Sequence, residues 1–209
     1  MRKRYEKTLI TRNIEIPMRD GVILRADHYQ PVTDDKLPAI VTRTPYLKES
    51  DQFSDCYSPG EMAARGYHIL FCDTRGSGQS DGVFYPFKNE RNDGYDTIKW
   101  VSEQPWCDGR VGMLGLSYVG GTQIWAGSQN PPGLKCLEPG MTSGEWLPTF
   151  KKGRFFHRTS IMWYLKQARH ALTSDKGDLT DERRQELIDK TTEYLTYGLV
   201  EQSNYLPFM

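Results

Sequence analysis

Four short apolar segments, separated by stretches with helical periodicity, constrain most strongly how this chain can fold. Each segment has the length of a strand and is bounded by turn residues. The apolar segments are residues 38–46, 67–73, 110–115 and 134–139, and the helical stretches are residues 58–66, 93–104 and 118–129. Strands that alternate with helices are typical of a parallel sheet with crossover helices. We therefore predict an α/β fold.

A β-hairpin is predicted ahead of the first of these segments. The sequence GVILRADHYQP alternates with a period of two residues, which is the pattern of a half-buried strand. The turn sequence Arg19-Asp20-Gly21 overlaps its start, and the strand-like stretch NIEIPM precedes that turn. The predicted sheet is therefore mostly parallel, with a hairpin at its N-terminal end.

The pattern changes near residue 141. No clear strand is predicted beyond that point, whereas residues 155–172 and 180–198 have the apolar spacing or the end signals of helices. We therefore predict an α/β part over residues 1–140 and a helical part over residues 141–209.

Charge and composition exclude several classes of partner. The chain has 27 basic and 27 acidic residues, so no general electrostatic reason favours nucleic acid or an anionic membrane. The N-terminus lacks the apolar core of a signal peptide, and no apolar run approaches the roughly 18 residues of a membrane span. We expect a cytoplasmic protein. Its mean hydropathy of −0.65 is low for an α/β enzyme, so either a polar extension dilutes the core or part of the core is missing.

The four cysteines are widely spaced and form no CxxC pair, so a zinc site is not predicted. Cys72 and Cys136 lie in apolar runs and are expected to be buried small hydrophobic residues.

The third apolar segment leads into a serine within the sequence GLSYVG. Ser117 lies between a predicted strand and a predicted helix, with Gly115 before it and Gly120 after it. The arrangement is similar to the G-x-S-x-G turn that exposes a nucleophilic serine, although Val119 occupies the second glycine position. The helix beginning at Tyr118 directs its first N–H groups toward the same place, so the Tyr118 N–H is a predicted oxyanion donor. The alternative is an ordinary Gly-Ser turn.

Several ordered motifs carry a family resemblance. They are MRDGVILRADHYQP, RTPY, DTRGSGQSDG, WVSEQPWCDGRVGMLGLSYVGGTQ and EPGMTSGEW. Together they resemble the CocE/NonD family of serine hydrolases, which includes cocaine esterases, α-amino-acid ester hydrolases and X-Pro dipeptidyl-peptidases of the S15 type. The resemblance covers about two thirds of the chain, and the family's serine motif is itself G-x-S-Y-x-G, so Val119 agrees with it.

The resemblance implies an α/β-hydrolase fold and a role for three residues. Ser117 would be the nucleophile that forms an acyl-enzyme with an ester or an X-Pro peptide. Tyr46, in the RTPY motif, would share the oxyanion hole with the backbone N–H of Tyr118. From the residues alone, Tyr46 would be a packing residue at the end of a strand. No cofactor or metal is implied, because this chemistry uses only side chains and backbone donors.

The loop DTRGSGQSDG offers an alternative function. Its glycines have the spacing G-x-G-x-x-x-G, one residue too long for the dinucleotide-binding fingerprint. We therefore disfavour nucleotide binding and expect Asp73 and Arg75 to brace the serine region rather than to react.

A catalytic base for Ser117 is not evident. Serine hydrolases of this fold order their triad as Ser, then Asp or Glu, then His. The later histidines are His157 and His170, and the only acids between Ser117 and His170 are Glu138 and Glu145. The earlier histidines, His28 and His68, lie in predicted strands, and we expect His68 to be a hydrogen-bonded packing residue.

The resemblance implies that residues 141–209 are part of an inserted helical cap and that the triad Asp and His follow the cap. We therefore expect a truncated chain that carries the N-terminal part of the hydrolase sheet. The alternative is an inactive fragment or split-gene product that needs a partner chain. An incomplete sheet would favour self-association or binding of such a complementing chain.

Overall fold

The computed structural model describes residues 4–49, 58–143, 151–152, 155–156, 158–173 and 180–197. Its contacts divide the chain into two compact units. The first comprises Met1–Gly82 and Phe87–Thr142, and the second comprises Val83–Pro86 and Ser143–Met209.

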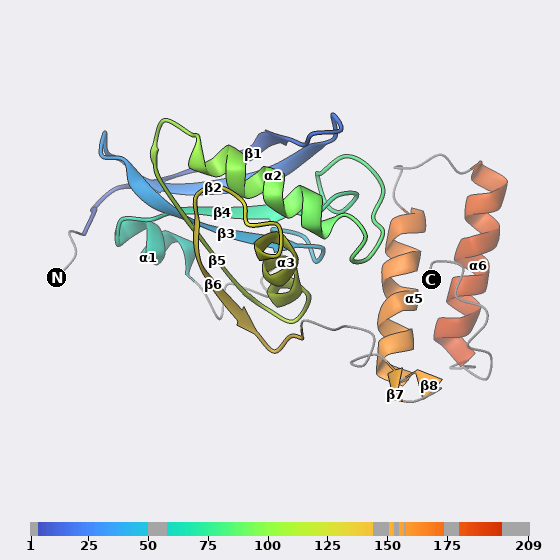
Figure 1. Cartoon of the computed structure of the whole chain (residues 1–209). Helices are drawn as coiled ribbons and strands as arrows, with labels where there is room; N and C mark the ends of the chain where they lie inside the picture. Colours follow the sequence, from blue (N-terminus) through green and yellow to red (C-terminus); the bar gives the residue numbers. More distant parts are fainter. Residues whose placement is uncertain are drawn as a thin grey trace. The chain divides into compact units, whose positions relative to one another are not determined.

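A six-stranded sheet forms the centre of the first unit (Figure 1). Its strands in spatial order are β1 (Thr8–Pro17), β2 (Ile23–Pro31), β4 (His68–Asp73), β3 (Leu37–Thr44), β5 (Cys107–Leu116) and β6 (Leu134–Gly140). The strands β3 to β6 run parallel, whereas β1 and β2 form an antiparallel hairpin that joins the sheet at β4. The predicted α/β fold with a mostly parallel sheet is confirmed.

The order of the strands reverses beside β3. The chain passes from β3 through α1 (Pro59–Ala64) to β4 on one side, and then through α2 (Glu90–Ser102) to β5 on the other side. The helix α3 (Tyr118–Gly127) connects β5 to β6. In open α/β sheets, ligands bind outside the carboxyl ends of the strands at such a reversal. The segments that follow β3 and β5 are therefore the expected place for a site.

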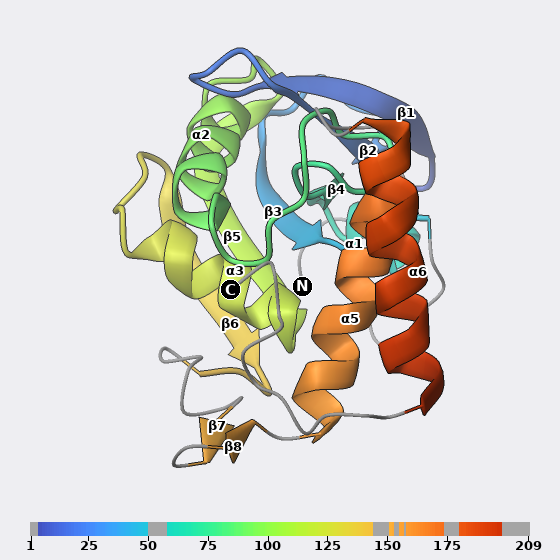
Figure 2. The ribbon, with the colours of Figure 1, turned by 90° about the vertical axis from the view of Figure 1, so that its right-hand side faces the viewer.

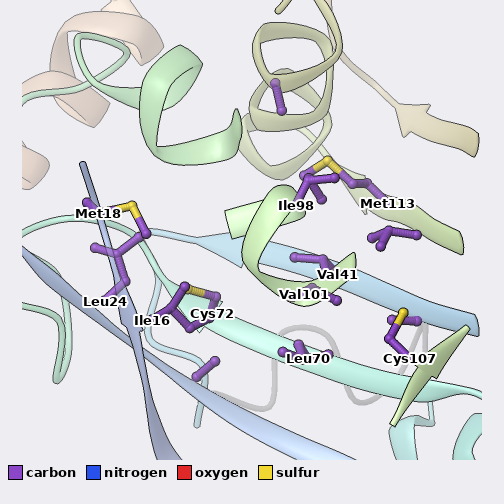
Figure 3. Close-up of a cluster of buried hydrophobic side chains, with 14 residues drawn as sticks. Ile16, Met18, Leu24, Val41, Leu70, Cys72, Ile98, Val101, Cys107 and Met113 are labelled. Carbon is purple, nitrogen blue, oxygen red and sulfur yellow. The ribbon is translucent and has the colours of Figure 1, made fainter. Parts of the chain in front are cut away.

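Successive residues of the central strands face two apolar layers. Leu70 and Cys72 of β4 belong to a core that also contains Ile98 and Val101 of α2 (Figure 3). Ile69 and Phe71 lie in the layer on the other face, where α1 contributes Met62. Accordingly, α2 and α3 lie on one side of the strands β3 and β5, and α1 lies on the other (Figure 2).

Two helices show how local and tertiary signals set their ends. The helix α1 begins after Ser58, whose hydroxyl accepts a hydrogen bond from the Glu61 N–H, and the chain turns away at Gly66, which has a φ of +87°. Gly66 is also the last residue of the predicted helical stretch 58–66. The helix α2 begins at Glu90 rather than at residue 93 as predicted. The Glu90 side chain is buried against Arg43, and this tertiary contact has no local sequence signal.

The two cysteines predicted to be buried differ in the structure. Cys72 is fully buried, and burial raises its pKa to about 12. Cys136 is exposed, so the prediction for this residue was wrong. The reason is its position in β6, the last strand of the described sheet, where residues 135–139 are all exposed.

The second unit contains two packed helices, α5 (Arg158–Thr173) and α6 (Asp181–Tyr197). Leu165, Leu172 and Leu187 are buried in it. Two short paired strands, β7 (Lys151–Lys152) and β8 (Phe155–Phe156), precede the helices, so the prediction of no strand beyond residue 141 was wrong. Strands of two residues are too short to show a period in the sequence. None of the described helices combines the length and the apolar character needed to cross a membrane.

A buried histidine pair links β2 to β4. The His28 Nε2 and His68 Nδ1 atoms lie 2.9 Å apart in a hydrogen bond, and both rings pack against Trp106 with centroid distances of 4.5 and 4.4 Å. The predicted hydrogen-bonded packing role of His68 is confirmed. Burial lowers the pKa of His28 to about 3 and that of His68 to about 4, so both imidazoles are neutral near pH 7.

Because this histidine pair is buried in its neutral form, we expect the folded chain to lose stability in mild acid. In the unfolded chain both imidazoles bind protons below about pH 6.5, whereas the folded chain keeps them neutral to about pH 4. The free energy of unfolding should therefore be highest above pH 6.5 and fall by about 2 kcal/mol per histidine from pH 7 to pH 5. Urea unfolding followed by tryptophan fluorescence measures this dependence. The double variant H28Q/H68Q should show a shallower pH dependence, and parallel curves for the two proteins would contradict the assignment.

Candidate active site

Ser117 lies at a sharp turn between β5 and α3. Its φ of 59° and ψ of −124° lie outside the regions that residues with a Cβ atom normally adopt. Its side chain is exposed, although the next residues, Tyr118 and Val119, are buried. The Ser117 N–H donates a hydrogen bond of 2.9 Å to the Gly140 carbonyl at the end of β6. The turn therefore presents the hydroxyl to solvent while the surrounding packing holds a strained backbone.

Two glycines allow the close packing that this turn requires. A Cβ atom on Gly115 would lie 2.2 Å from the Val119 Cγ1, and a Cβ atom on Gly120 would lie 2.7 Å from the Gly140 oxygen. Val119 is completely buried and fills the space that Gly115 leaves. The second glycine of the motif is needed one residue later because position 120 is the one that faces β6.

The two predicted oxyanion donors belong to neighbouring elements. Tyr118 is the first residue of α3, and Tyr46 follows β3, the strand that pairs with β5. The two tyrosine rings meet edge to face with centroids 6.3 Å apart. The Tyr46 N–H bonds the Thr44 hydroxyl at 3.0 Å, which helps to fix the turn after β3. The structure thus brings the three predicted residues to one edge of the sheet, and their chemical roles stay predictions.

The side chain of Tyr118 enters a buried polar cluster. Its hydroxyl donates to Glu90 Oε1 at 2.8 Å and accepts from the Phe87 N–H at 3.0 Å. Glu90 Oε2 lies 2.9 Å from the Arg43 Nη1, and both side chains are buried. Burial and the adjacent Glu90 carboxylate raise the pKa of Tyr118 well above its ordinary value, so the phenol stays protonated as a donor. Sequence reasoning missed Glu90 and Arg43; the available signal was an arginine inside the apolar segment PAIVTRTPY.

Asp73 and Arg75 make bracing contacts with the loops after β3 and β4 and with α2, and their predicted bracing of the serine region stays a prediction. The Asp73 carboxylate accepts hydrogen bonds from the backbone N–H groups of Lys48 at 2.7 Å and Gln79 at 3.0 Å, so it joins the loops that follow β3 and β4. Arg75 bonds Asp93 of α2 at 2.6 Å. Burial raises the pKa of Asp73, and these N–H donors and Lys48 oppose the rise.

The histidines described in the sheet are remote from Ser117. The strand register aligns His68 with Ala39 and Ala39 with Val111, six residues before Ser117. At about 3.3 Å per residue, this offset amounts to about 20 Å along the strands. His28 is bonded to His68 and lies in the same place.

The other acids and histidines considered for a catalytic triad form no triad with Ser117 in the described part of the chain. Glu138 is exposed, and its main chain is bonded to the Gln123 side chain. Glu145 and His157 lie outside the described residues, and His170 lies in α5 with its side chain outside the description. The described residues contain no group of three ligating side chains that could hold a metal ion.

The sequence profile of one protein family matches most of the chain. Residues 20–206 match the family described as X-Pro dipeptidyl-peptidase (S15 family). The chain belongs to this family. It is 40% identical over 138 residues to cocaine esterase from Rhodococcus sp. (strain MB1 Bresler), an alignment that covers 65% of this chain and 24% of that protein. The chain therefore spans about a quarter of the length of this curated relative.

Solved structures agree with the assignment of the fold. A CocE/NonD family hydrolase from Staphylococcus aureus superposes with a TM-score of 0.71 and 24% identity, covering 87% of this chain and 36% of that chain. A structure described as an α-amino acid ester hydrolase gives a TM-score of 0.63 with 27% identity, covering 77% of this chain and 30% of that chain. The S15-family member described here thus has the α/β-hydrolase fold.

The strained turn predicts an unusual response to glycine at position 117. S117G removes the Cβ atom and with it a strain of about 1–3 kcal/mol, whereas S117A keeps the Cβ atom and the strain. Glycine also increases the conformational entropy of the unfolded chain, and this offsets part of the stability gained by removing the strain. We therefore expect S117G to be about 1 kcal/mol more stable than S117A in urea unfolding. If S117G is less stable than S117A, the result would contradict the conclusion that the backbone at position 117 is strained.

Proposed function

We propose that Ser117 is the nucleophile of a serine hydrolase that cleaves acyl esters. The observation that carries the proposal is the strained, exposed conformation of Ser117 at the carboxyl end of β5, beside the reversal of strand order. Membership of the S15 family and the similarity to a cocaine esterase support the same chemistry.

The proposed reaction proceeds through an acyl-enzyme. The Ser117 hydroxyl loses its proton to a base while its oxygen bonds to the acyl carbon, and the electrons of the carbonyl double bond move to the oxygen. The Tyr118 N–H and the Tyr46 hydroxyl donate to this oxyanion. Its collapse expels the alkoxide, which takes the proton, and a water molecule then attacks the acyl-enzyme and releases the carboxylic acid.

We further propose that the base and its orienting acid come from outside the described part of this chain, either from further sequence of the same protein or from a complementing chain. This proposal is supported by the position of the His28–His68 pair, remote from Ser117, and by the order of the acids and histidines that follow the serine. The exposed strand β6, the last of the described sheet, offers a parallel edge for such residues, and residues 141–209 would form part of a cap. Without a base, the isolated chain would be a very slow esterase.

As the substrate class, we propose an uncharged acyl ester rather than a compound with a free ammonium group. An ammonium group needs an uncompensated carboxylate in the site, because a buried unpaired cation is unfavourable. In the described part of the chain, each of the four buried carboxylates already has a basic partner. They are Asp27 with Arg12, Asp73 with Lys48, Glu90 with Arg43, and Asp93 with Arg75.

Selective reaction with a fluorophosphonate tests the role of Ser117. The Ser117 oxygen bonds to phosphorus and fluoride leaves, so peptide mass spectrometry identifies the modified residue. We expect slow modification of the 209-residue chain that accelerates up to about tenfold per pH unit, because the alkoxide attacks in the absence of a base. Ser128, which is also exposed, is an internal control and should react at least about tenfold more slowly.

Two outcomes would overturn parts of this proposal. Equal modification of Ser117 and Ser128 would show that the turn gives no catalytic advantage and would contradict the nucleophile. Fast stoichiometric modification of Ser117 at pH 7 would show that these 209 residues supply their own base, and would contradict the need for a base from elsewhere.

A further inference from the structure

The buried cluster around Glu90 connects the two predicted oxyanion donors. Tyr118 hydrogen bonds to one oxygen of the Glu90 carboxylate, and Arg43 forms an ion pair with the other. Arg43 lies in β3, three residues before Tyr46, and Tyr118 begins α3. One carboxylate on α2 therefore contacts both the helix that carries one donor and the strand that leads to the other.

We propose that Glu90 is a positioning residue that sets the separation between the Tyr118 N–H and the Tyr46 hydroxyl. This inference rests on the proposed oxyanion role of the two tyrosines. Glu90 is itself buried beneath the turn and acts through the phenol of Tyr118 and the guanidinium of Arg43. It is assigned no contact with the substrate.

The charge balance holds the Glu90 carboxylate in one orientation. The Arg43 side chain is fully buried, and its Nε and Nη2 atoms have no hydrogen-bond partner among the described residues. Asp93, the next acid near it, is 4.0 Å from Nη2. If Glu90 turned away, Arg43 would become a poorly compensated buried cation, which is strongly unfavourable. The carboxylate therefore cannot rotate freely, and the Tyr118 phenol is held with it.

The hydroxyl of Tyr118 is also held from a second side. It accepts the Phe87 N–H, and Phe87 has a φ of +71° and stacks on the Tyr118 ring with centroids 4.9 Å apart. The ring is thus fixed by a donor, an acceptor and a stacked face. Because the Tyr118 backbone follows Ser117 directly, this fixation reaches the N–H at the start of α3. A displacement of about 1 Å in such a donor can slow a reaction by about a hundredfold.

A double-mutant cycle on the full 209-residue chain tests this positioning. The measured quantity is the rate of Ser117 modification by the fluorophosphonate, for E90Q alone, Y46F alone and both together. We expect E90Q to slow the reaction by at least about tenfold, and to slow it by less than about threefold when Y46F has already removed the second donor. Such non-additivity is the signature of positioning, because a general loss of structure slows both backgrounds equally.

Two further variants keep the test decisive if E90Q folds poorly. Y118F retains the backbone N–H and the stacked ring but removes the hydroxyl, and it should give the same non-additivity with Y46F. T97V removes a buried hydroxyl on the same helix, bonded to the Asp93 carbonyl, and serves as the control for lost stability. It should leave the rate of modification unchanged.

The outcomes separate this inference from the proposed function. E90Q and Y118F could each slow the reaction by the same factor whether residue 46 is tyrosine or phenylalanine. That result would overturn the positioning role alone. Slowing by T97V as large as that by E90Q would also overturn it. If Ser117 of the chain without substitutions reacts with the fluorophosphonate no faster than Ser128, the proposed function fails and the positioning role fails with it.

Discussion

The strained backbone at Ser117 is the constraint on which the rest of the first unit depends. A φ of 59° with a ψ of −124° is unfavourable for serine and persists only where the surroundings impose it. Here Val119 packs into the space of Gly115, Gly120 lies against Gly140, and the Gly140 carbonyl accepts the Ser117 N–H. Three consecutive elements, β5, α3 and β6, are thus packed too closely for the turn to relax.

A second, electrostatic constraint stabilises the same region from beneath. Arg43 introduces a cation into the interior of a parallel strand, and α2 begins where its first residue, Glu90, can neutralise that cation. The same carboxylate binds the Tyr118 phenol. The start of α2, the end of β3 and the start of α3 are therefore coupled through one buried group, which links the packing of the fold to the geometry of the site.

The sequence predicted the elements well because their signals are local. The strands ending at Thr44, Asp73 and Leu116 are apolar runs bounded by turn residues, and the turn at Ser117 has a recognisable glycine spacing. The errors arose where tertiary contacts determine the end of an element or the exposure of a residue. The early start of α2 depends on Arg43, and the exposure of Cys136 depends on the position of β6 at the end of the sheet. Glu90 could not be found as a site-related residue, because its partners lie 47 and 28 positions away in the chain.

The most direct test of the proposed site is a crystal structure of the chain after phosphonylation. If Ser117 is the nucleophile, phosphorus is covalently bonded to its Oγ atom. A phosphonyl oxygen is then expected about 2.7–3.1 Å from both the Tyr118 backbone nitrogen and the Tyr46 hydroxyl oxygen. A phosphonyl oxygen directed into solvent, or an adduct on a different residue, would contradict the assignment of this turn as a nucleophile with its two oxyanion donors.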